Sequence, residues 1–100
     1  MIRIVNLKSY VAVDNEVLVR VDRKSALGNP FKMNDESERD SVCDRYEAYF
    51  ERMRVENDAF HKELGRIWKL ARKTNVALGC WCAPRRCHAE TIKRFIEQYL

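Results

Sequence analysis

Residues 76–82, Val-Ala-Leu-Gly-Cys-Trp-Cys, constrain the fold of this chain more than any other stretch. The run is apolar without a helical period, and it lies between Asn75 and Pro84. A short apolar run with such flanks favours a buried strand over a helix. Because side chains alternate along a strand, Cys80 and Cys82 would then point to the same face.

Two more strands are predicted near the start of the chain. Residues 2–7 are rich in branched side chains, which indicates a first strand, and we expect it to lie inside the sheet. Residues 16–22 interleave valines and a leucine with charged side chains, which indicates a second strand buried mainly on one face.

Three segments with apolar residues three and four positions apart predict helices. The first begins near Ser37 and runs past Met53. Residues 57–58 offer a new N-cap, and the second helical segment runs from there to about Lys73, either as a separate helix or as the kinked extension of the first. The last runs from residue 87 or 88 to near Leu100.

These elements predict one α/β domain over residues 1–100, with a small mixed sheet of three or four strands and about three helices. One hundred residues can bury a single core but not two. A glycine-rich phosphate loop, a dinucleotide fingerprint and a serine-hydrolase elbow are all missing from the sequence, so those enzyme classes are excluded.

The overall charge favours anionic partners. The net charge is +4 and the isoelectric point is near 9.0, which suits nucleotides, nucleic acid or an acidic protein face. The first residues carry Arg3 and Lys8 and do not form a signal peptide, so we expect a cytoplasmic protein without a membrane partner. In a reducing compartment the four cysteines would be thiols, metal ligands or core residues.

Three cysteines and a histidine lie within residues 80–88 and mark a candidate site. Cys80, Cys82, Cys87 and His88 supply the ligand types of a tetrahedral zinc site, although adjacent residues 87 and 88 diverge around a helix. Alternatively, Cys87 at the start of the last helix would be the most acidic thiol and a nucleophile, with His88 transferring protons. A third interpretation packs the cysteines as small apolar residues.

An anion pocket is the interpretation that we favour. Gly28 allows close approach of the main chain, the last helix offers free N–H groups, and Arg23, Arg85 and Arg86 can donate to phosphate oxygens. We therefore predict that residues 23–31 pack against residues 80–88 around a nucleotide-like molecule. The alternative for the loop is a tight turn in which a phenylalanine fills the core.

Two other classes of partner stay open. The side chains of Arg85, Arg86, Lys93 and Arg94 could contact nucleic acid, each phosphate contact adding to the salt dependence, or they could form a solvated helix face. A protein that binds and inhibits a host factor would leave no readable motif.

Several motifs together resemble a small family of phage and bacterial proteins described as a domain of unknown function, DUF4326. The matching residues are Asn6, Arg23, Gly28-Asn29-Pro30-Phe31, Arg39 with Tyr46, and the Cys-Trp-Cys-x-Pro-x-x-Cys-His stretch of residues 80–88. The resemblance implies a shared site joining the two stretches, with Arg23, Gly28, Asn29, Pro30, Arg39, Arg85 and Arg86 as ligand-binding candidates. It implies no established activity, and a viral gene would place the protein in the host cytoplasm, where it could act on a host enzyme.

Overall fold

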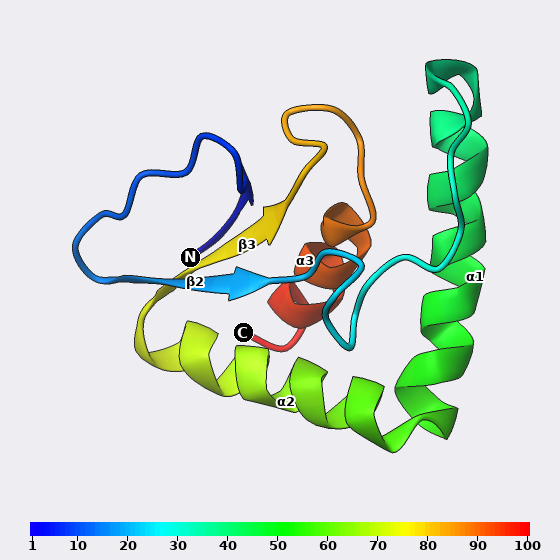
Figure 1. The fold of residues 1–100 in the computed structure, drawn as a ribbon. Helices are drawn as coiled ribbons and strands as arrows, with labels where there is room; N and C mark the ends of the chain where they lie inside the picture. Colours follow the sequence, from blue (N-terminus) through cyan, green and yellow to red (C-terminus); the bar gives the residue numbers. More distant parts are fainter.

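The strands form one parallel sheet in the order β1-β3-β2. In the computed structural model, which describes residues 1–100, β1 spans Ile2–Asn6, β2 spans Glu16–Arg20 and β3 spans Asn75–Cys80 (Figure 1). The predicted α/β class and three strands are confirmed. Two expectations were wrong, because the sheet is wholly parallel rather than mixed and β1 lies at its edge. The central place belongs to β3, the only strand without a charged residue.

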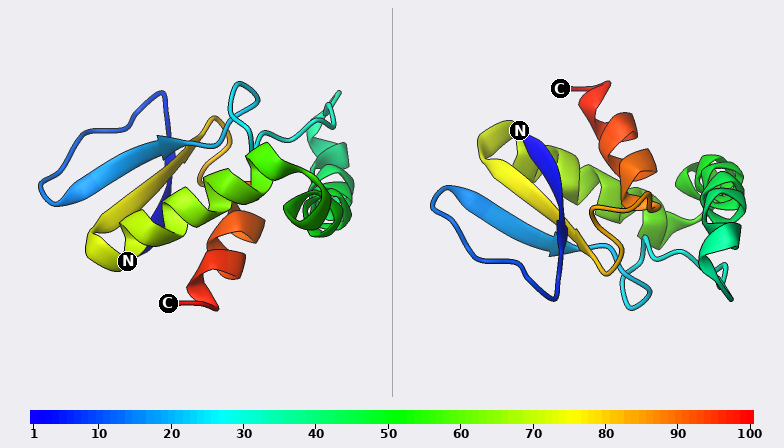
Figure 2. Two further views of the ribbon diagram at one scale, coloured as in Figure 1. Left: turned by 90° about the horizontal axis from the view of Figure 1, so that it is seen from below. Right: turned by 90° about the horizontal axis from the view of Figure 1, so that it is seen from above.

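Helices cover one face of this sheet. Helix α2 (Asp58–Lys73) packs against β3, and α3 (Ala89–Glu97) packs against β1 and β3 (Figure 2). The core between the sheet and these helices is continuous, and its strand residues include Ile2, Val19, Val76, Leu78 and Cys80. The predicted periodicity of both helices is therefore the pattern of this core.

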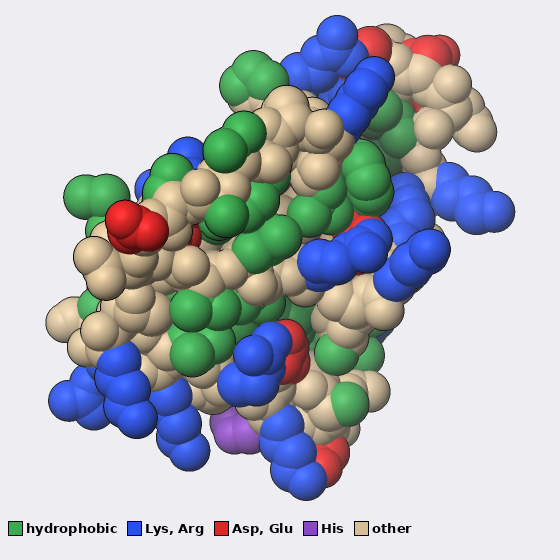
Figure 3. Space-filling model, turned by 60° about the vertical axis from the view of Figure 1, so that its left-hand side comes forward, with side chains coloured by type: hydrophobic (Ala, Val, Ile, Leu, Met, Phe, Trp, Pro, Cys, Tyr) green, Lys and Arg blue, Asp and Glu red, His purple; other side chains and the backbone are tan.

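The connection from β1 to β2, residues 7–15, lies against the other face. The central strand presents Ala77 and Gly79 there, and a Cβ on Gly79 would lie 2.5 Å from Leu7. Small residues on β3 let side chains of the two outer strands meet above it, and Arg3 of β1 donates to Glu16 of β2 at 2.7 Å. Figure 3 brings this side of the molecule forward and shows hydrophobic side chains exposed among basic ones.

Helix α1 (Arg39–Glu56) stands beyond the carboxyl ends of β2 and β3 (Figure 1). The short 3₁₀ turn η1 (Glu36–Glu38) leads into it. Asn57 leaves the helical conformation and its side chain accepts a hydrogen bond from the Phe60 N–H, so α1 and α2 are separate helices. None of the helices is both long and apolar enough to cross a membrane.

Candidate functional site

A pocket of about 260 Å³ lies where the carboxyl ends of β2 and β3 face the start of α1. In a parallel sheet the carboxyl ends of the strands share one edge, which is where ligands bind in α/β domains. The segment after β2 forms one wall, the turn after β3 forms the second, and α1 closes the third. Residues 23–31 and 80–88 thus lie side by side.

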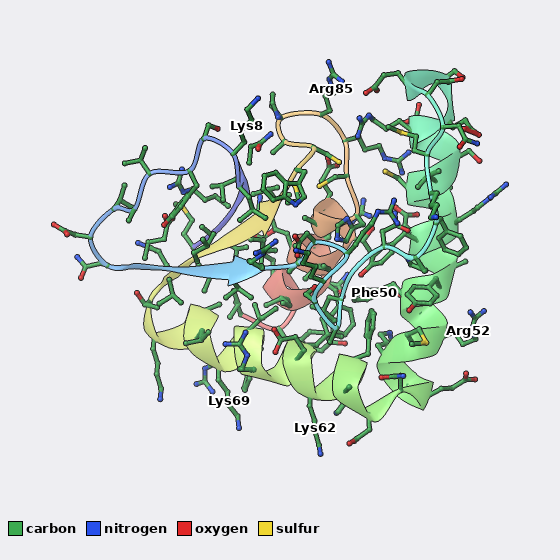
Figure 4. The ribbon with its side chains drawn as sticks, in the orientation of Figure 1. Lys8, Phe50, Arg52, Lys62, Lys69 and Arg85 are labelled. Atoms are coloured by element: carbon green, nitrogen blue, oxygen red, sulfur yellow. The ribbon has the colours of Figure 1, made fainter.

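Most of the residues singled out from the sequence line this pocket. The eight that do so are Arg23, Asn29, Arg39, Cys80, Cys82, Arg86, Cys87 and His88. The three that do not are Gly28, Pro30 and Arg85. Figure 4 shows Arg85 at the outer tip of the turn, where it pairs with Glu36.

Arg23 organises its own loop. Its guanidinium donates to the backbone carbonyls of Asn29 at 2.6 Å and Phe31 at 2.8 Å. The positive charge has no carboxylate partner, and three of the five N–H donors of the guanidinium stay available. Arg23 therefore holds the loop and can still contact an anion.

Gly28 is needed for a different reason from the one expected. A Cβ at this position would lie 2.6 Å from the carbonyl oxygen of Asp22 and 2.7 Å from the Cα of Arg23. The close approach is thus between two parts of the chain's own backbone, and Gly28 shapes the loop without lining the pocket.

Cys80 and Cys87 bring their sulfurs to 3.2 Å from each other, and both side chains are buried. Hydrogen bonding from Cys87, together with the backbone N–H groups of Cys82 and Ala83, lowers the pKa of Cys80 to about 6 against the effect of burial. The same contact, with burial, raises the pKa of Cys87. The pair therefore shares one proton at neutral pH, and the expectation that Cys87 is the most acidic thiol was wrong.

The argument that Cys80 and Cys82 share a strand face was also wrong. Strand β3 ends at Cys80, so alternation does not extend to Cys82. The partly exposed Cys82 reaches the pocket from the turn instead.

The His88 side chain is buried and connects two elements of the fold. Its Nε2 contacts the backbone carbonyl of Val21, and its ring packs edge-on to that of Tyr46 at 4.9 Å. Because a carbonyl only accepts, Nε2 carries the proton. Burial lowers the pKa of His88, so the ring is neutral at pH 7 and joins the start of α3 to the end of β2.

The amino end of α3 is already occupied. The backbone N–H of Cys87 donates to the Glu90 carboxylate at 3.3 Å, which puts a negative charge at the positive end of the helix. The N–H of Cys87 is therefore not open to an anion, and the Glu90 carboxylate would repel one bound beside it.

The four predicted zinc ligands do not form a metal site. No group of three or more histidine, cysteine, aspartate or glutamate side chains in the structure is arranged to hold a metal ion. Two sulfurs on one tetrahedral zinc would lie about 3.8 Å apart, given zinc–sulfur bonds of about 2.3 Å, whereas Cys80 and Cys87 lie at 3.2 Å. His88 is committed to the Val21 carbonyl.

The basic side chains proposed for nucleic acid all have acidic neighbours. The ion pairs are Arg85 with Glu36, Arg86 with Asp40, Asp44 and Glu47, Arg94 with Glu47, and Lys93 with Glu97. The surface is mixed in sign, so it differs from the continuous basic patch that binds phosphate backbones. Arg39 is similarly paired with Glu36 and also donates to the Arg86 carbonyl.

Comparison with known families gives one match. The model of the family described as "Domain of unknown function (DUF4326)" matches residues 5–98. The chain belongs to this family. The resemblance drawn from the motifs is thus confirmed, and the match includes both stretches that form the pocket of this DUF4326 domain. Comparisons with curated proteins and with solved structures give no match.

Sequence reasoning assigned no site role to six pocket residues of the DUF4326 domain, and three of these, Asp22, Trp81 and Lys24, carry polar groups. Asp22 is 5% exposed, and its Oδ2 accepts from Arg20 and from the Trp81 indole, while its Oδ1 has no hydrogen-bond partner. Burial raises the pKa of Asp22, but the hydrogen bonds from Arg20 and Trp81, the charge of Arg20 and the backbone N–H of Lys24 outweigh it, and the pKa is lowered. Lys24 is exposed and has no ion pair. A carboxylate directly after a valine-rich strand was the available signal for Asp22.

Proposed function

We propose that the pocket binds an anionic small molecule, a nucleotide or a nucleotide derivative. The observation that carries the proposal is a set of unsatisfied polar groups around one cavity. Arg23 and Lys24 have no carboxylate partner, and the buried Asp22 Oδ1 has no donor. Cations suit a phosphate, and a buried acceptor requires a ligand N–H or O–H.

The Asp22 oxygen favours a nucleotide over phosphate alone. A buried acceptor without a partner costs about 1–3 kcal/mol, and a sugar hydroxyl or a base amino group would relieve that cost. An inorganic anion would leave Asp22 unpaired and would be repelled by it. Trp81 supports the same choice, because the indole is 57% exposed at the pocket and stacking on a base contributes about 1–3 kcal/mol.

The size of the cavity limits the ligand. Its volume of about 260 Å³ lies just below the range of roughly 300–1,000 Å³ that is usual for drug-sized ligands. A mononucleotide could enter with its sugar and phosphate, whereas a dinucleotide would extend into solvent. We therefore propose a single nucleotide unit. Catalysis by Cys87 with His88 gains no support from a neutral histidine bonded to the backbone.

Thermal shift with nucleoside monophosphates and with inorganic phosphate tests the proposal. A ligand at one hundred times its Kd stabilises the folded state by about 2.7 kcal/mol, which raises the melting temperature of a domain this size by about 10 °C or more. We expect this rise with at least one nucleotide and a smaller one with phosphate. The matched variants are Lys24→Ala at the pocket and Lys69→Ala on α2, where Figure 4 shows Lys69 pointing away from the sheet.

Both lysines are exposed and without ion pairs, so both variants should fold. Lys24→Ala should reduce the shift, and Lys69→Ala should retain it. If no nucleotide stabilises the wild-type protein, or if the two variants lose the shift equally, the proposed pocket is wrong.

A further inference from the structure

The buried thiols in the pocket differ from one another in a way that packing alone does not explain. Cys43 is a buried thiol whose pKa is raised by burial, as expected of an inert core residue. Cys80 and Cys87 are just as buried, at 1% and 4% exposure, yet they face each other at 3.2 Å. Their elements are different, since one ends β3 and the other precedes α3.

The turn between them holds the two sulfurs together. The Asn6 side chain donates to the carbonyls of Ala83 at 2.9 Å and Trp81 at 3.3 Å, and the Arg85 N–H donates to the Cys82 carbonyl at 2.9 Å. The sulfurs of a disulfide are about 2.05 Å apart, so the pair needs to close by only about 1.2 Å. Because the folded chain already holds the two sulfurs close together, little further conformational entropy is lost when the disulfide forms.

We propose that Cys80 and Cys87 form a redox-active dithiol that reduces small dialkyl disulfides entering the pocket. Both side chains line the 260 Å³ cavity, which gives a small reagent its route to the sulfurs. The proposal rests on the thiol geometry alone and does not depend on nucleotide binding.

Thiol–disulfide exchange balances in two steps. The Cys80 thiolate attacks one sulfur of the reagent R–S–S–R, so the Cys80–S–R bond forms, the reagent's S–S bond breaks and RS⁻ leaves. RS⁻ takes the proton from the Cys87 thiol, and the Cys87 sulfur then attacks that of Cys80 and expels the second RS⁻. Two electrons pass from the dithiol to the reagent, and the products are one protein disulfide, one RSH and one RS⁻.

Cys80 is the better attacking sulfur. It accepts the Cys87 S–H and two backbone N–H groups, which stabilise negative charge on it. At pH 6 a larger fraction of Cys80 than of an ordinary thiol is therefore thiolate. The lower basicity reduces the nucleophilicity of the sulfur by less than the thiolate fraction rises, so the net effect is a faster attack.

The test treats the reduced protein with bis(2-hydroxyethyl) disulfide at pH 6, blocks the remaining thiols and maps the linked peptides by mass spectrometry. The expected product lacks two hydrogen atoms and links Cys80 to Cys87. This link should form faster in the folded protein than in the same chain unfolded in urea, because the fold holds the two sulfurs 3.2 Å apart and stabilises the Cys80 thiolate. Cys43→Ser is the matched control and should retain the link.

Cys87→Ser adds a second readout, because it should stop the reaction at the mixed disulfide on Cys80. Should that variant fail to fold, the wild-type peptide map still decides. Links that mainly involve Cys82, closure no faster in the folded protein than in urea, or no disulfide at all would each overturn the proposal.

Discussion

Replacing Gly28 by alanine tests how tightly the pocket loop is built. The added Cβ would lie 2.6 Å from the Asp22 carbonyl oxygen and 2.7 Å from the Arg23 Cα, so backbone atoms would have to move. Overpacking of this kind costs about 1–3 kcal/mol. Alanine also lowers the conformational entropy of the unfolded chain, which stabilises the folded state by about 0.4–1 kcal/mol. The free energy of unfolding should therefore fall by about 1–2 kcal/mol, and the melting temperature by about 5–15 °C.

Gly65→Ala is the matched control for this substitution. Gly65 lies inside α2, and its Cβ would meet nothing within 4 Å. The same chemical change should therefore stabilise the helix by about 0.5–1 kcal/mol and raise the melting temperature by about 2–8 °C. Urea unfolding of both variants measures the difference. If Gly28→Ala is as stable as Gly65→Ala, residues 22–23 and 28 do not approach one another as described.

Two further substitutions address the same region. The buried Tyr46 hydroxyl donates to the Leu27 carbonyl at 2.8 Å, so Tyr46→Phe should lower the free energy of unfolding by about 1–2 kcal/mol in urea titration, and an unchanged value would contradict that contact. Hydrogen bonds from Arg39 hold the pKa of Glu36 at about 2, below its ordinary 4.5. The ionised carboxylate then stabilises the fold above pH 4.5 and this contribution is lost as pH falls from 4.5 to 2. Glu36→Gln should accordingly show a shallower loss of stability across that window, and acid titrations of identical slope would refute the linkage.

The sequence predicted the elements well because their signals are local. Helical spacing, the Asn57 cap and the apolar run of β3 each act within a few residues, and the structure has all of them. The adjacency of residues 23–31 and 80–88 was also within reach, since parallel strands end at a common edge.

Other features depend on contacts between distant segments and were beyond sequence reasoning. The order of the strands brings Arg3 and Glu16 together above a small residue of β3, a contact that no local pattern shows. The acidity of Cys80 follows from its 3.2 Å contact with Cys87, whereas helix position alone suggested the reverse assignment. Glu90 at the amino end of α3 removed an anion site that helix geometry had favoured.

Oxidation of the thiol pair should alter nucleotide affinity, because the Cys80 thiolate and the phosphate of the proposed nucleotide would both carry negative charge in the same pocket. Because the pKa of Cys80 is lowered by its contact with Cys87, the reduced pair carries up to one negative charge at pH 7.5. Two unit charges about 8 Å apart repel by about 2 kcal/mol at an effective dielectric constant of about 20. Disulfide formation removes the thiolate, so the oxidised protein should bind a nucleoside monophosphate about tenfold more tightly or better.

Calorimetric titration of the reduced and oxidised protein at pH 7.5 measures this effect, since the phosphate stays dianionic in both. Cys43→Ala is the control, because that buried thiol does not share the proton of the pair and its loss should leave the difference intact. Linkage requires the reverse effect as well, so a bound nucleotide must raise the pKa of Cys80 and favour the disulfide. Equal affinities of the two redox forms would mean that the bound phosphate lies beyond the reach of the Cys80 charge, on the exposed side of Lys24.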